Sequence, residues 1–524
     1  MTSWNLADLF ESVADAVPDR EACVAGATRL SYCALDDRAN RLAHVLAGRG
    51  VRSGDCIAVA LRNCPEYLET MLAAFKLRAV PINVNVRYTA DELRYLINDA
   101  GATFVVHERD VVDQTLAAAP DLAAEHRLLC RGDEYETALT SSNAERPTIE
   151  RSGDDRYILY TGGTTGMPKG VVWRHEDLFF AALGGAYAVG EPITAPTDIA
   201  RRAPLGRARC LPASPFTHGT AHWMALTTLL QGGTVVLVVH APTFVAECVW
   251  DTVAAEEVTV LVIVGDAFGR PLADALDQAP DRWDLDRLLV VVSGGATLCP
   301  AVRHDLLRHL PGTVLVDGYG TSETGGQGLM PVWPGQTSSA LPRFNVDADT
   351  AVLDHAGRPV APGSGQTGRL ARRGRLPLGY HGDAERTAST FPVIDGVRWA
   401  IPGDLGRVEE DGSVTLLGRG GSSINSGGEK VFPDEVEAVL RAHADVFDAI
   451  VVGVPDPRWG QEVTAVVVLR PDRSTDPNEL IAHCRAQLAR FKAPRRVVLV
   501  ADLHRKPSGK PDLAWAEAVA ARRR

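Results

Sequence analysis

The chain has 524 residues, which at about 150 residues per domain predicts three to four domains. Its 54 basic and 66 acidic side chains leave a formal charge of −12, which disfavours binding to the phosphate backbone of nucleic acids. Nine scattered cysteines without a CxxC pair fit neither a disulfide framework nor a zinc site, and the apolar runs are far shorter than the ~18 residues of a membrane span. We therefore expect a cytoplasmic protein with reduced, mostly buried thiols and no membrane segment.

The first predicted elements are a helix and a series of alternating strands and helices. Residues 1–20 carry acids among apolar residues and lack the basic start and apolar centre of a secretory signal, so they predict an amphipathic helix. From residue 56 onward, strands near 56–61, 80–84 and 103–107 alternate with helices near 65–77 and 91–100. This alternation is typical of βαβ units.

A second series of apolar strands lies farther along the chain, and helix-length segments separate its members, which are residues 234–239, 258–264, 288–295 and 313–320. Such continuous apolar strands indicate sheets that are covered on both faces. Between residues 342 and 418, short strands broken by Gly and Pro predict a small barrel or a distorted sheet. After residue 418 the pattern returns to mixed helices and strands, so the predicted fold class is α/β.

A glycine-rich loop follows directly after the apolar strand YILY. Residues 160–170 read YTGGTTGMPKG, a composition in which backbone N–H groups and hydroxyls converge on phosphate oxygens and a lysine adds a point charge. A Walker A loop would need Gly-Lys followed by Ser or Thr. Here Pro168 precedes Lys169 and Gly170 follows it, which disfavours an ordinary P-loop NTPase.

This loop resembles that of the adenylate-forming superfamily, which includes acyl-CoA synthetases, adenylation domains of peptide synthetases, and luciferases. Further segments follow in the order of that family, so the resemblance covers nearly the whole chain. They are SPFTHGT (214–220), SGGA (293–296), DGYGTSETGG (317–326), PGD (402–404), GRGGSSINSGGEKVFPDEVE (418–437) and PSGK (507–510).

The resemblance implies an architecture of two parts. Residues 1–418 would form a large N-terminal domain, with two α/β subdomains to about residue 340 and a β-rich, barrel-like subdomain at 341–418. Residues 419–422 would be a hinge, and residues 423–524 a small mobile α+β domain. Locally, Pro433 is suited to the first position of a helix, with acids in the first turn and an apolar stripe after them.

Two strand ends predict the nucleotide-binding edge of a sheet. Each runs into glycine, at residues 292–295 and 316–320, and open α/β sheets bind ligands at such carboxyl ends. A flat adenine would fit between these turns and the Tyr319 ring. Seen one at a time, each segment reads equally well as a tight strand-to-helix turn.

The resemblance extends this edge to a complete site for ATP, Mg²⁺ and coenzyme A. Asp404 would hold the ribose hydroxyls with Arg419 assisting, and Glu323 would hold Mg²⁺ together with Thr161, since a carboxylate suits that ion. The remaining nucleotide contacts would come from Thr161, Gly162, Gly163, Thr164, Thr165, Gly166, Lys169, Gly294, Gly295, Ala296, Asp317, Gly318, Tyr319, Gly320 and Thr321.

The family chemistry has two steps. A carboxylate attacks the α-phosphate of MgATP to give an acyl-adenylate, and the CoA thiolate then displaces AMP. By resemblance Lys510 aligns the reactants of the first step, Lys169 binds phosphate, and His218 lies between the acyl pocket and the CoA channel. Between the steps the small domain rotates and brings a CoA-facing strand over the site, made of Ser426, Gly427, Gly428, Glu429 and Lys430.

The sequence departs from the family at the hinge. A charged pair, often Lys-Asp, usually stands where this chain has Gly421 and Ser422. Rotation is still feasible, but the charges that bias the two states are missing. An alternative is therefore that the chain acts mainly in thioesterification of an acyl-adenylate made elsewhere. A second alternative is a non-catalytic acyl- or nucleotide-binding paralogue, which Lys169, Glu323 and Lys510 argue against.

The substrate is expected to be a small-molecule carboxylic acid without an amino group. Residues 216–218 offer no aspartate for an amino group, and no carrier domain follows residue 524. VGDAFG (264–269) and the 418–437 segment resemble actinobacterial acyl-CoA synthetases for fatty acids, steroid side chains or bulky terpenoid acids. Five glycines would leave room for such groups: Gly219, Gly265, Gly294, Gly295 and Gly325. The sequence names neither the acid nor the oligomeric state, so a homodimer stays open.

Only six of the 54 basic residues are lysines. Codon usage in a GC-rich genome explains the scarcity, but the remaining lysines are then enriched where a compact ammonium is needed. Lys169 and Lys510 fall in segments for making the adenylate and Lys430 in the segment for consuming it, with Lys506 close to Lys510. Lys76 and Lys492 have no predicted task.

Overall fold

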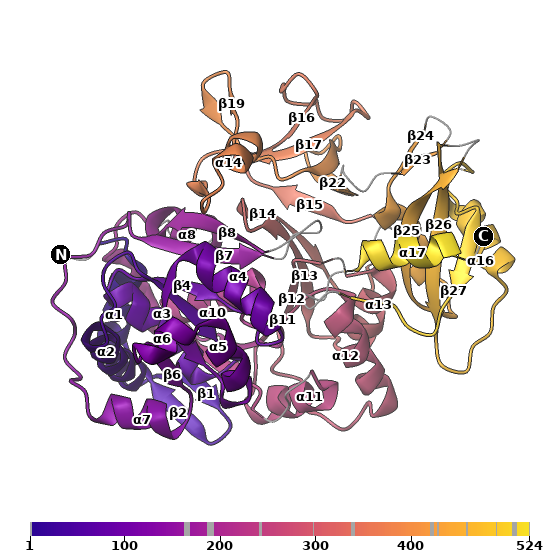
Figure 1. The fold of residues 1–524 in the computed structure, drawn as a ribbon. Coiled ribbons are helices and arrows are strands. Elements are labelled where there is room, and N and C mark those ends of the chain that lie inside the picture. Colours follow the sequence, from indigo (N-terminus) through magenta and orange to yellow (C-terminus); the bar gives the residue numbers. More distant parts are fainter. Residues whose placement is uncertain are drawn as a thin grey trace.

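The computed structural model describes residues 3–161, 168–185, 193–239, 244–296, 298–336, 341–419, 424–426, 429–456, 460–488, 490–505 and 511–522. Figure 1 shows a large part, which carries the N-terminal end of the chain, and beside it a smaller part that is formed by the end of the chain. No helix in the described ranges is long and apolar enough to cross a membrane.

The first sheet has seven strands in the order β18-β8-β7-β4-β3-β5-β6. Its strands are β3 (Cys56–Ala60), β4 (Val80–Asn83), β5 (Ala102–His107), β6 (Leu128–Cys130), β7 (Arg156–Thr161), β8 (Lys169–Arg174) and β18 (Gly379–Tyr380). The pairs β3·β4 and β3·β5 are parallel, which confirms the predicted βαβ units. The accompanying helices are α1 (Leu6–Ala16), α2 (Tyr32–Gly48), α3 (Pro65–Lys76), α4 (Ala90–Ala100), α5 (Val112–Ala118), α6 (Pro120–Ala124), α7 (Asp133–Thr140) and α8 (His175–Ala182).

The second sheet has thirteen strands in the order β16-β17-β21-β22-β15-β14-β13-β12-β11-β9-β10-β1-β2. Its central strands are β9 (Arg209–Pro212), β10 (Thr234–Leu237), β11 (Val260–Ile263), β12 (Val290–Gly294), β13 (Val314–Thr321) and β14 (Gly325–Val332). The early hairpin β1 (Glu21–Ala25) and β2 (Thr28–Ser31) joins it at β10. The helices are α9 (Asp198–Arg202), α10 (Gly219–Leu230), α11 (Ala246–Ala255), α12 (Asp266–Gln278) and α13 (Pro300–His309).

The predicted β-rich segment extends this second sheet. Strand β15 (Arg343–Val346) pairs with both β14 and β22, so within the described residues the strands continue the sheet in one path and do not close into a separate barrel. This corresponds to the distorted-sheet alternative. The other elements are β16 (Thr350–Leu353), β17 (Thr367–Arg372), α14 (Ala384–Thr390), β19 (Val393–Ile394), β20 (Val397–Arg398), β21 (Asp404–Val408) and β22 (Val414–Arg419).

The end of the chain forms a separate small sheet in which β24, β23, β26 and β25 are neighbours and β27 pairs with β26. The strands are β23 (Ile424–Ser426), β24 (Glu429–Val431), β25 (Val446–Asp456), β26 (Gly460–Leu469) and β27 (Arg496–Leu499), and the helices are α15 (Pro433–Arg441), α16 (Pro477–Gln487) and α17 (Leu513–Arg522). Pro433 is the first residue of α15, as predicted, and Val436, Val439 and Leu440 are buried.

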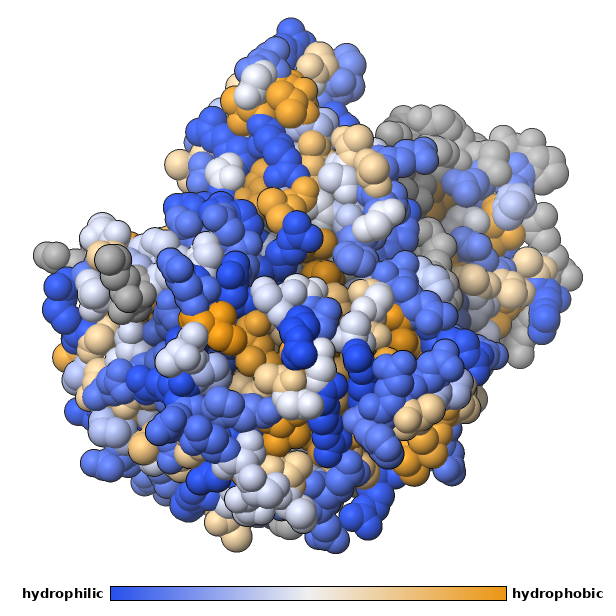
Figure 2. Space-filling model, turned by 60° about the vertical axis from the view of Figure 1, so that its left-hand side comes forward, coloured by the Kyte–Doolittle hydropathy of each residue, from blue (hydrophilic) through white to orange (hydrophobic). Residues whose placement is uncertain are grey.

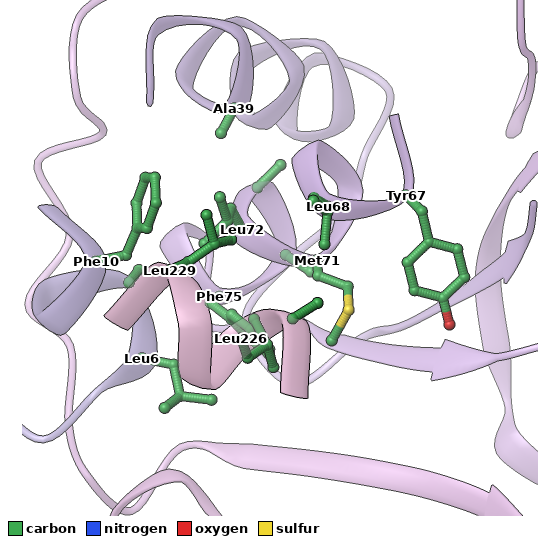
Figure 3. Close-up of a cluster of buried hydrophobic side chains, with 14 of the residues drawn as sticks. Leu6, Phe10, Ala39, Tyr67, Leu68, Met71, Leu72, Phe75, Leu226 and Leu229 are labelled. Atoms are coloured by element: carbon green, nitrogen blue, oxygen red, sulfur yellow. The ribbon is translucent and has the colours of Figure 1, made fainter. Parts of the chain in front are cut away.

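The largest apolar core lies between the N-terminal helices and α10. Figure 3 shows Leu6 and Phe10 of α1, Met71 and Phe75 of α3, and Leu226 of α10 in contact across the cluster. The predicted amphipathic helix at the N-terminus therefore packs on a distant segment of the chain. On the face shown in Figure 2, by contrast, apolar side chains gather in a few patches and most of the surface is hydrophilic.

Candidate active site

A single cleft of about 2510 Å³ runs between the carboxyl ends of the central strands, the β-rich segment and the small C-terminal part. Residues predicted to bind nucleotide or to act in catalysis line it from several elements. Those present are Thr161, Lys169, His218, Gly294, Gly295, Ala296, Asp317, Gly318, Tyr319, Gly320, Thr321, Glu323 and Asp404. Other predicted site residues lie outside the described residues, namely Gly162, Gly163, Thr164, Thr165, Gly166, Gly427, Gly428 and Lys510.

The two ends of the glycine-rich loop are held together by a β-hairpin. Antiparallel pairing of β7 with β8 places Thr161 opposite Lys169. Asn83, at the end of β4, accepts a hydrogen bond of 2.7 Å from the Tyr160 N–H and donates one of 2.8 Å to the Tyr160 carbonyl oxygen. Its amide also donates to the Thr217 carbonyl oxygen at 2.8 Å. The neighbouring strand therefore fixes the loop ends beside the segment that carries His218.

The predicted nucleotide edge is formed by β12 and β13. These strands are parallel, and the register places Gly294 opposite Gly318 at their carboxyl ends. Asp317 is buried here, and burial raises its pKa to about 7 although the charge of Arg303, 3.8 Å away, acts in the opposite direction. Arg303 comes from α13, and no local pattern predicts this pairing because the two residues meet only in the folded sheet.

Tyr319 and Asp404 are joined directly. The Tyr319 hydroxyl donates a 2.9 Å hydrogen bond to Oδ2 of Asp404, which is buried. The antiparallel register of β21 with β22 places the Arg419 backbone opposite Asp404. Tyr319 and Asp404, two of the residues predicted to surround adenosine, thus meet in the cleft, and the tyrosine hydroxyl orients the carboxylate.

Glu323 lies in the turn between β13 and β14, where the Tyr380 hydroxyl donates a 2.7 Å hydrogen bond to its Oε1. Tyr380 also lines the cleft, and the sequence analysis missed it. A carboxylate oriented in this way lines the same cleft as Thr161 and presents the hard oxygen donors that Mg²⁺ prefers. The residues present therefore fit a magnesium ion that also binds phosphate.

His218 is the N-cap residue of α10. The segment before it is fixed by Asn63, whose amide donates to the Ser214 carbonyl oxygen at 2.9 Å and whose Oδ1 accepts from the Phe216 N–H at 2.7 Å. Asn63 lies just beyond the carboxyl end of β3. Its position as a polar residue at the end of an apolar strand is a pattern that can be recognised in the sequence, but Asn63 was not among the predicted site residues.

The small C-terminal part borders the cleft through residues on either side of the PSGK segment, which itself lies outside the described residues. Arg505 and Pro511, which flank the PSGK segment, line the cleft and pair with each other as an antiparallel bridge. Ser426 is buried in β23 and is not among the lining residues, and the backbones of Glu429 and Lys430 pair with β23. Within the described residues, Arg505 and Pro511 on either side of the PSGK segment therefore lie at the cleft, whereas Ser426 does not line it.

Comparisons with known proteins identify the family. The model of the AMP-binding enzyme family matches residues 10–380, and the model of the AMP-binding enzyme C-terminal domain matches residues 435–510. This chain belongs to the AMP-binding enzyme family. The resemblance stated from the sequence motifs, and the α/β fold with a smaller C-terminal domain, are thereby confirmed.

Relatives in this family match over nearly their full length. The chain is 45% identical, over 98% of its own length and 95% of the relative, to a medium/long-chain-fatty-acid–CoA/3-oxocholest-4-en-26-oate–CoA ligase of Mycobacterium tuberculosis. It is 42% identical, over 98% and 95% of the two chains, to a 3-oxocholest-4-en-26-oate–CoA ligase of Rhodococcus rhodochrous. Among solved structures, ATP-bound MatB from Rhodopseudomonas palustris superposes with a TM-score of 0.82 at 28% identity and covers 98% of each chain.

Proposed function

We propose that this chain is an AMP-forming acyl-CoA ligase for medium- to long-chain fatty acids or steroid side-chain acids. The observation that carries the proposal is the continuity of the cleft. The same cavity is lined by the nucleotide edge and by apolar residues such as Ile199, Leu230 and Phe244. Its volume of about 2510 Å³ exceeds the ~300–1,000 Å³ of an ordinary small-molecule pocket, so a nucleotide and a bulky acid fit together. The acids in the names of the two relatives, medium- or long-chain fatty acids and 3-oxocholest-4-en-26-oate, are bulky acids of this kind.

The reaction has two balanced steps. A carboxylate oxygen of the acid attacks the α-phosphorus of ATP, the bond to the β-phosphate oxygen breaks, and acyl-adenylate and pyrophosphate form. The CoA thiolate then attacks the acyl carbonyl carbon, a thioester forms, and AMP leaves with the electron pair of the broken bond. Each step needs the anionic reactants held in line at short distance.

The residues of this chain are proposed to divide between the two steps. Lys169 and Lys510 would neutralise the reacting oxygens during adenylation, while Tyr319, Asp404 and Arg419 hold the adenosine. His218 would lie where the acyl carbonyl meets the thiol. Rotation of the small domain would withdraw Lys510 and bring the segment of Ser426 and Lys430 to the cleft.

A magnesium ion is proposed at Glu323 and Thr161. When bound, it would withdraw charge from the phosphate oxygens and so favour departure of pyrophosphate. The protein's own contribution is the fixed carboxylate, which the Tyr380 hydroxyl holds at 2.7 Å.

The direct test is product formation by the purified chain. With ATP, CoA and octanoate, palmitate or 3-oxocholest-4-en-26-oate, we expect the acyl-CoA, AMP and pyrophosphate in equal amounts, and no pyrophosphate when the acid is omitted. Lys510→Ala should abolish pyrophosphate release, because the adenylation step loses its aligning charge. A broad panel of acids without any release would favour the binding-paralogue alternative and contradict the proposal.

The departure from the family's charged pair at the hinge supports a second candidate function, in which the chain mainly consumes an acyl-adenylate made elsewhere. Gly421 and Ser422 lack the usual charges and lie outside the described residues. Supplying free acid with ATP and CoA, and separately a synthetic acyl-adenylate with CoA, distinguishes the two functions. A full ligase turns over both at similar rates, whereas the second candidate uses only the adenylate efficiently.

A further inference from the structure

Helix α10 has two different faces along its length. Leu226 and Leu229 face the apolar core, whereas the cleft is lined by Thr220, Trp223, Met224, Thr227 and Leu230. These positions recur at helical spacing and therefore form one continuous stripe. The stripe begins two residues after His218 and extends for about 15 Å, at ~1.5 Å per residue.

The Trp223 side chain lies at the start of this stripe. A Cβ atom placed on Gly219 would lie 3.8 Å from Cδ2 of Trp223, so the indole covers the first turn of α10 beside His218. The indole Nε1–H donates a 3.1 Å hydrogen bond to the Tyr157 hydroxyl oxygen. One edge of the ring is thus anchored in the core, while the side chain remains partly accessible from the cleft.

The anchor continues through a buried chain of hydrogen bonds. The Tyr157 hydroxyl bonds to Nε2 of His222, and Nδ1 of His222 bonds to the Phe216 carbonyl oxygen at 2.6 Å. A carbonyl oxygen only accepts, so Nδ1 carries the proton and Nε2 accepts from Tyr157. Burial lowers the pKa of His222 to about 4, which keeps the ring neutral and this direction of donation fixed. Phe216 lies two residues before His218, so this chain of hydrogen bonds connects the indole of Trp223 to the backbone just before His218.

We propose that Trp223 is the wall that sets the acid selectivity next to the reacting carboxylate, and that Tyr157 and His222 are positioning residues that hold its indole. This inference rests on the acyl-CoA ligase function proposed above. A tryptophan provides a large rigid surface once its N–H is bonded. Without the bond, the indole gains rotamer freedom, and the site loses its discrimination between acids of different shape.

The test is the selectivity of Tyr157→Phe, which removes only the hydroxyl. We measure kcat/KM for octanoate, palmitate and 3-oxocholest-4-en-26-oate with the full chain. In the variant, the ratio of kcat/KM between the best and the poorest of the three acids should fall about tenfold, which is the effect of roughly one poorly placed methylene contact. The change should appear in the KM for the acid. The KM for ATP should stay unchanged, because Tyr319 and Asp404 are not touched. Trp223→Phe, which keeps a ring but lacks the donor, should narrow the preference similarly.

A matched control and a double variant make the test specific. Tyr67→Phe removes another buried hydroxyl, which donates to the same Phe216 carbonyl oxygen at 3.2 Å but does not contact the indole, and it should keep the wild-type selectivity. If Tyr157 acts through Trp223, the variant that combines Tyr157→Phe with Trp223→Phe should match Trp223→Phe alone. Additive effects, equal selectivity changes in Tyr67→Phe, or a wild type without preference would overturn the inference. Absence of any acyl-CoA from the wild type would instead contradict the proposed function.

Discussion

At the scale of single residues, the site depends on hydroxyl groups that orient charged partners. Tyr319 donates to Asp404 and Tyr380 donates to Glu323, each across a long separation in sequence. Tyr319 belonged to a recognisable motif, so the sequence predicted its place. Tyr380 and Asn63 did not, because their roles arise only when strands distant in the chain become neighbours.

Removing the Tyr319 hydroxyl should weaken ATP binding more than the chemical step. In Tyr319→Phe the ring that we propose to face adenine remains, but Asp404 loses the hydrogen bond of 2.9 Å that orients it. A bond to a charged group contributes about 1.5 kcal/mol, so we expect KM for ATP to rise about tenfold with kcat nearly unchanged, measured by acid-dependent pyrophosphate release. Tyr95→Phe, which removes a hydroxyl bonded to Asp99, is the control and should leave KM unaltered. A fall in kcat at constant KM would contradict this role.

The scarcity of lysine gives a second prediction at this scale. Lys169→Arg retains the charge but replaces a compact ammonium with a planar group that needs more space. We expect kcat/KM for adenylation to fall about tenfold or more, equivalent to about 1.4 kcal/mol. Lys492→Arg is the matched control, since Lys492 pairs with Glu435 at 2.7 Å. Near-normal adenylation by Lys169→Arg would show that charge alone suffices there.

At the scale of helices and strands, apolar patterning predicted most of the architecture. The alternating segments after residue 56 and the apolar runs of the second series lie in the strands and helices found. Patterning could not show that β1 and β2 join β10, or that β15 continues the sheet from β14, because strand order depends on non-local packing. It also could not assign Lys76, a cation within an apolar helix.

Lys76 pairs with carboxylates at the place where α1, α2 and α3 pack together. Its Nζ is fully buried and donates to Glu11 at 2.5 Å and to Asp36 at 2.6 Å. Burial alone raises the pKa of Glu11, but the Arg151 hydrogen bond and the charges of Lys76 and Arg151 outweigh it and hold that pKa below its usual value. The lysine therefore ties three helices together through the carboxylates of Glu11 and Asp36.

Replacing this lysine should destabilise the large domain strongly. Lys76→Met leaves two buried carboxylates without their shared cation, so the free energy of unfolding should fall by about 3–5 kcal/mol, as measured by urea denaturation. The control is Lys492→Met, whose partly exposed pair is worth about 0–1 kcal/mol. If both variants lost the same free energy, the buried ion pairs would not be what holds the three helices.

At the scale of the whole molecule, the two parts of the chain meet through charges at the edge of the cleft. Arg441 of α15 bonds within its own domain to Glu437 and Asp448, each at 2.9 Å, and its Nε also lies 3.9 Å from Oδ2 of Asp266 at the start of α12. The contact between Arg441 and Asp266 is thus a feature of the orientation in which Arg505 and Pro511, on either side of the PSGK segment, line the cleft. Rotation to the CoA-facing orientation would separate this pair.

Neutralising Asp266 should therefore affect the two half-reactions differently. In Asp266→Asn the Oδ1 acceptor for the Cys299 N–H, now at 2.8 Å, is kept, while the attraction to Arg441 is lost. A pair at this separation is worth up to about 1 kcal/mol, so adenylation should slow about two- to fivefold, whereas thioesterification of a synthetic acyl-adenylate should not slow. Both rates are measured separately by rapid quench. Asp277→Asn on the same helix is the control, because Asp277 pairs with Arg308 inside the large domain. Equal slowing of both steps would mean that the pair stabilises the fold and does not bias the orientation.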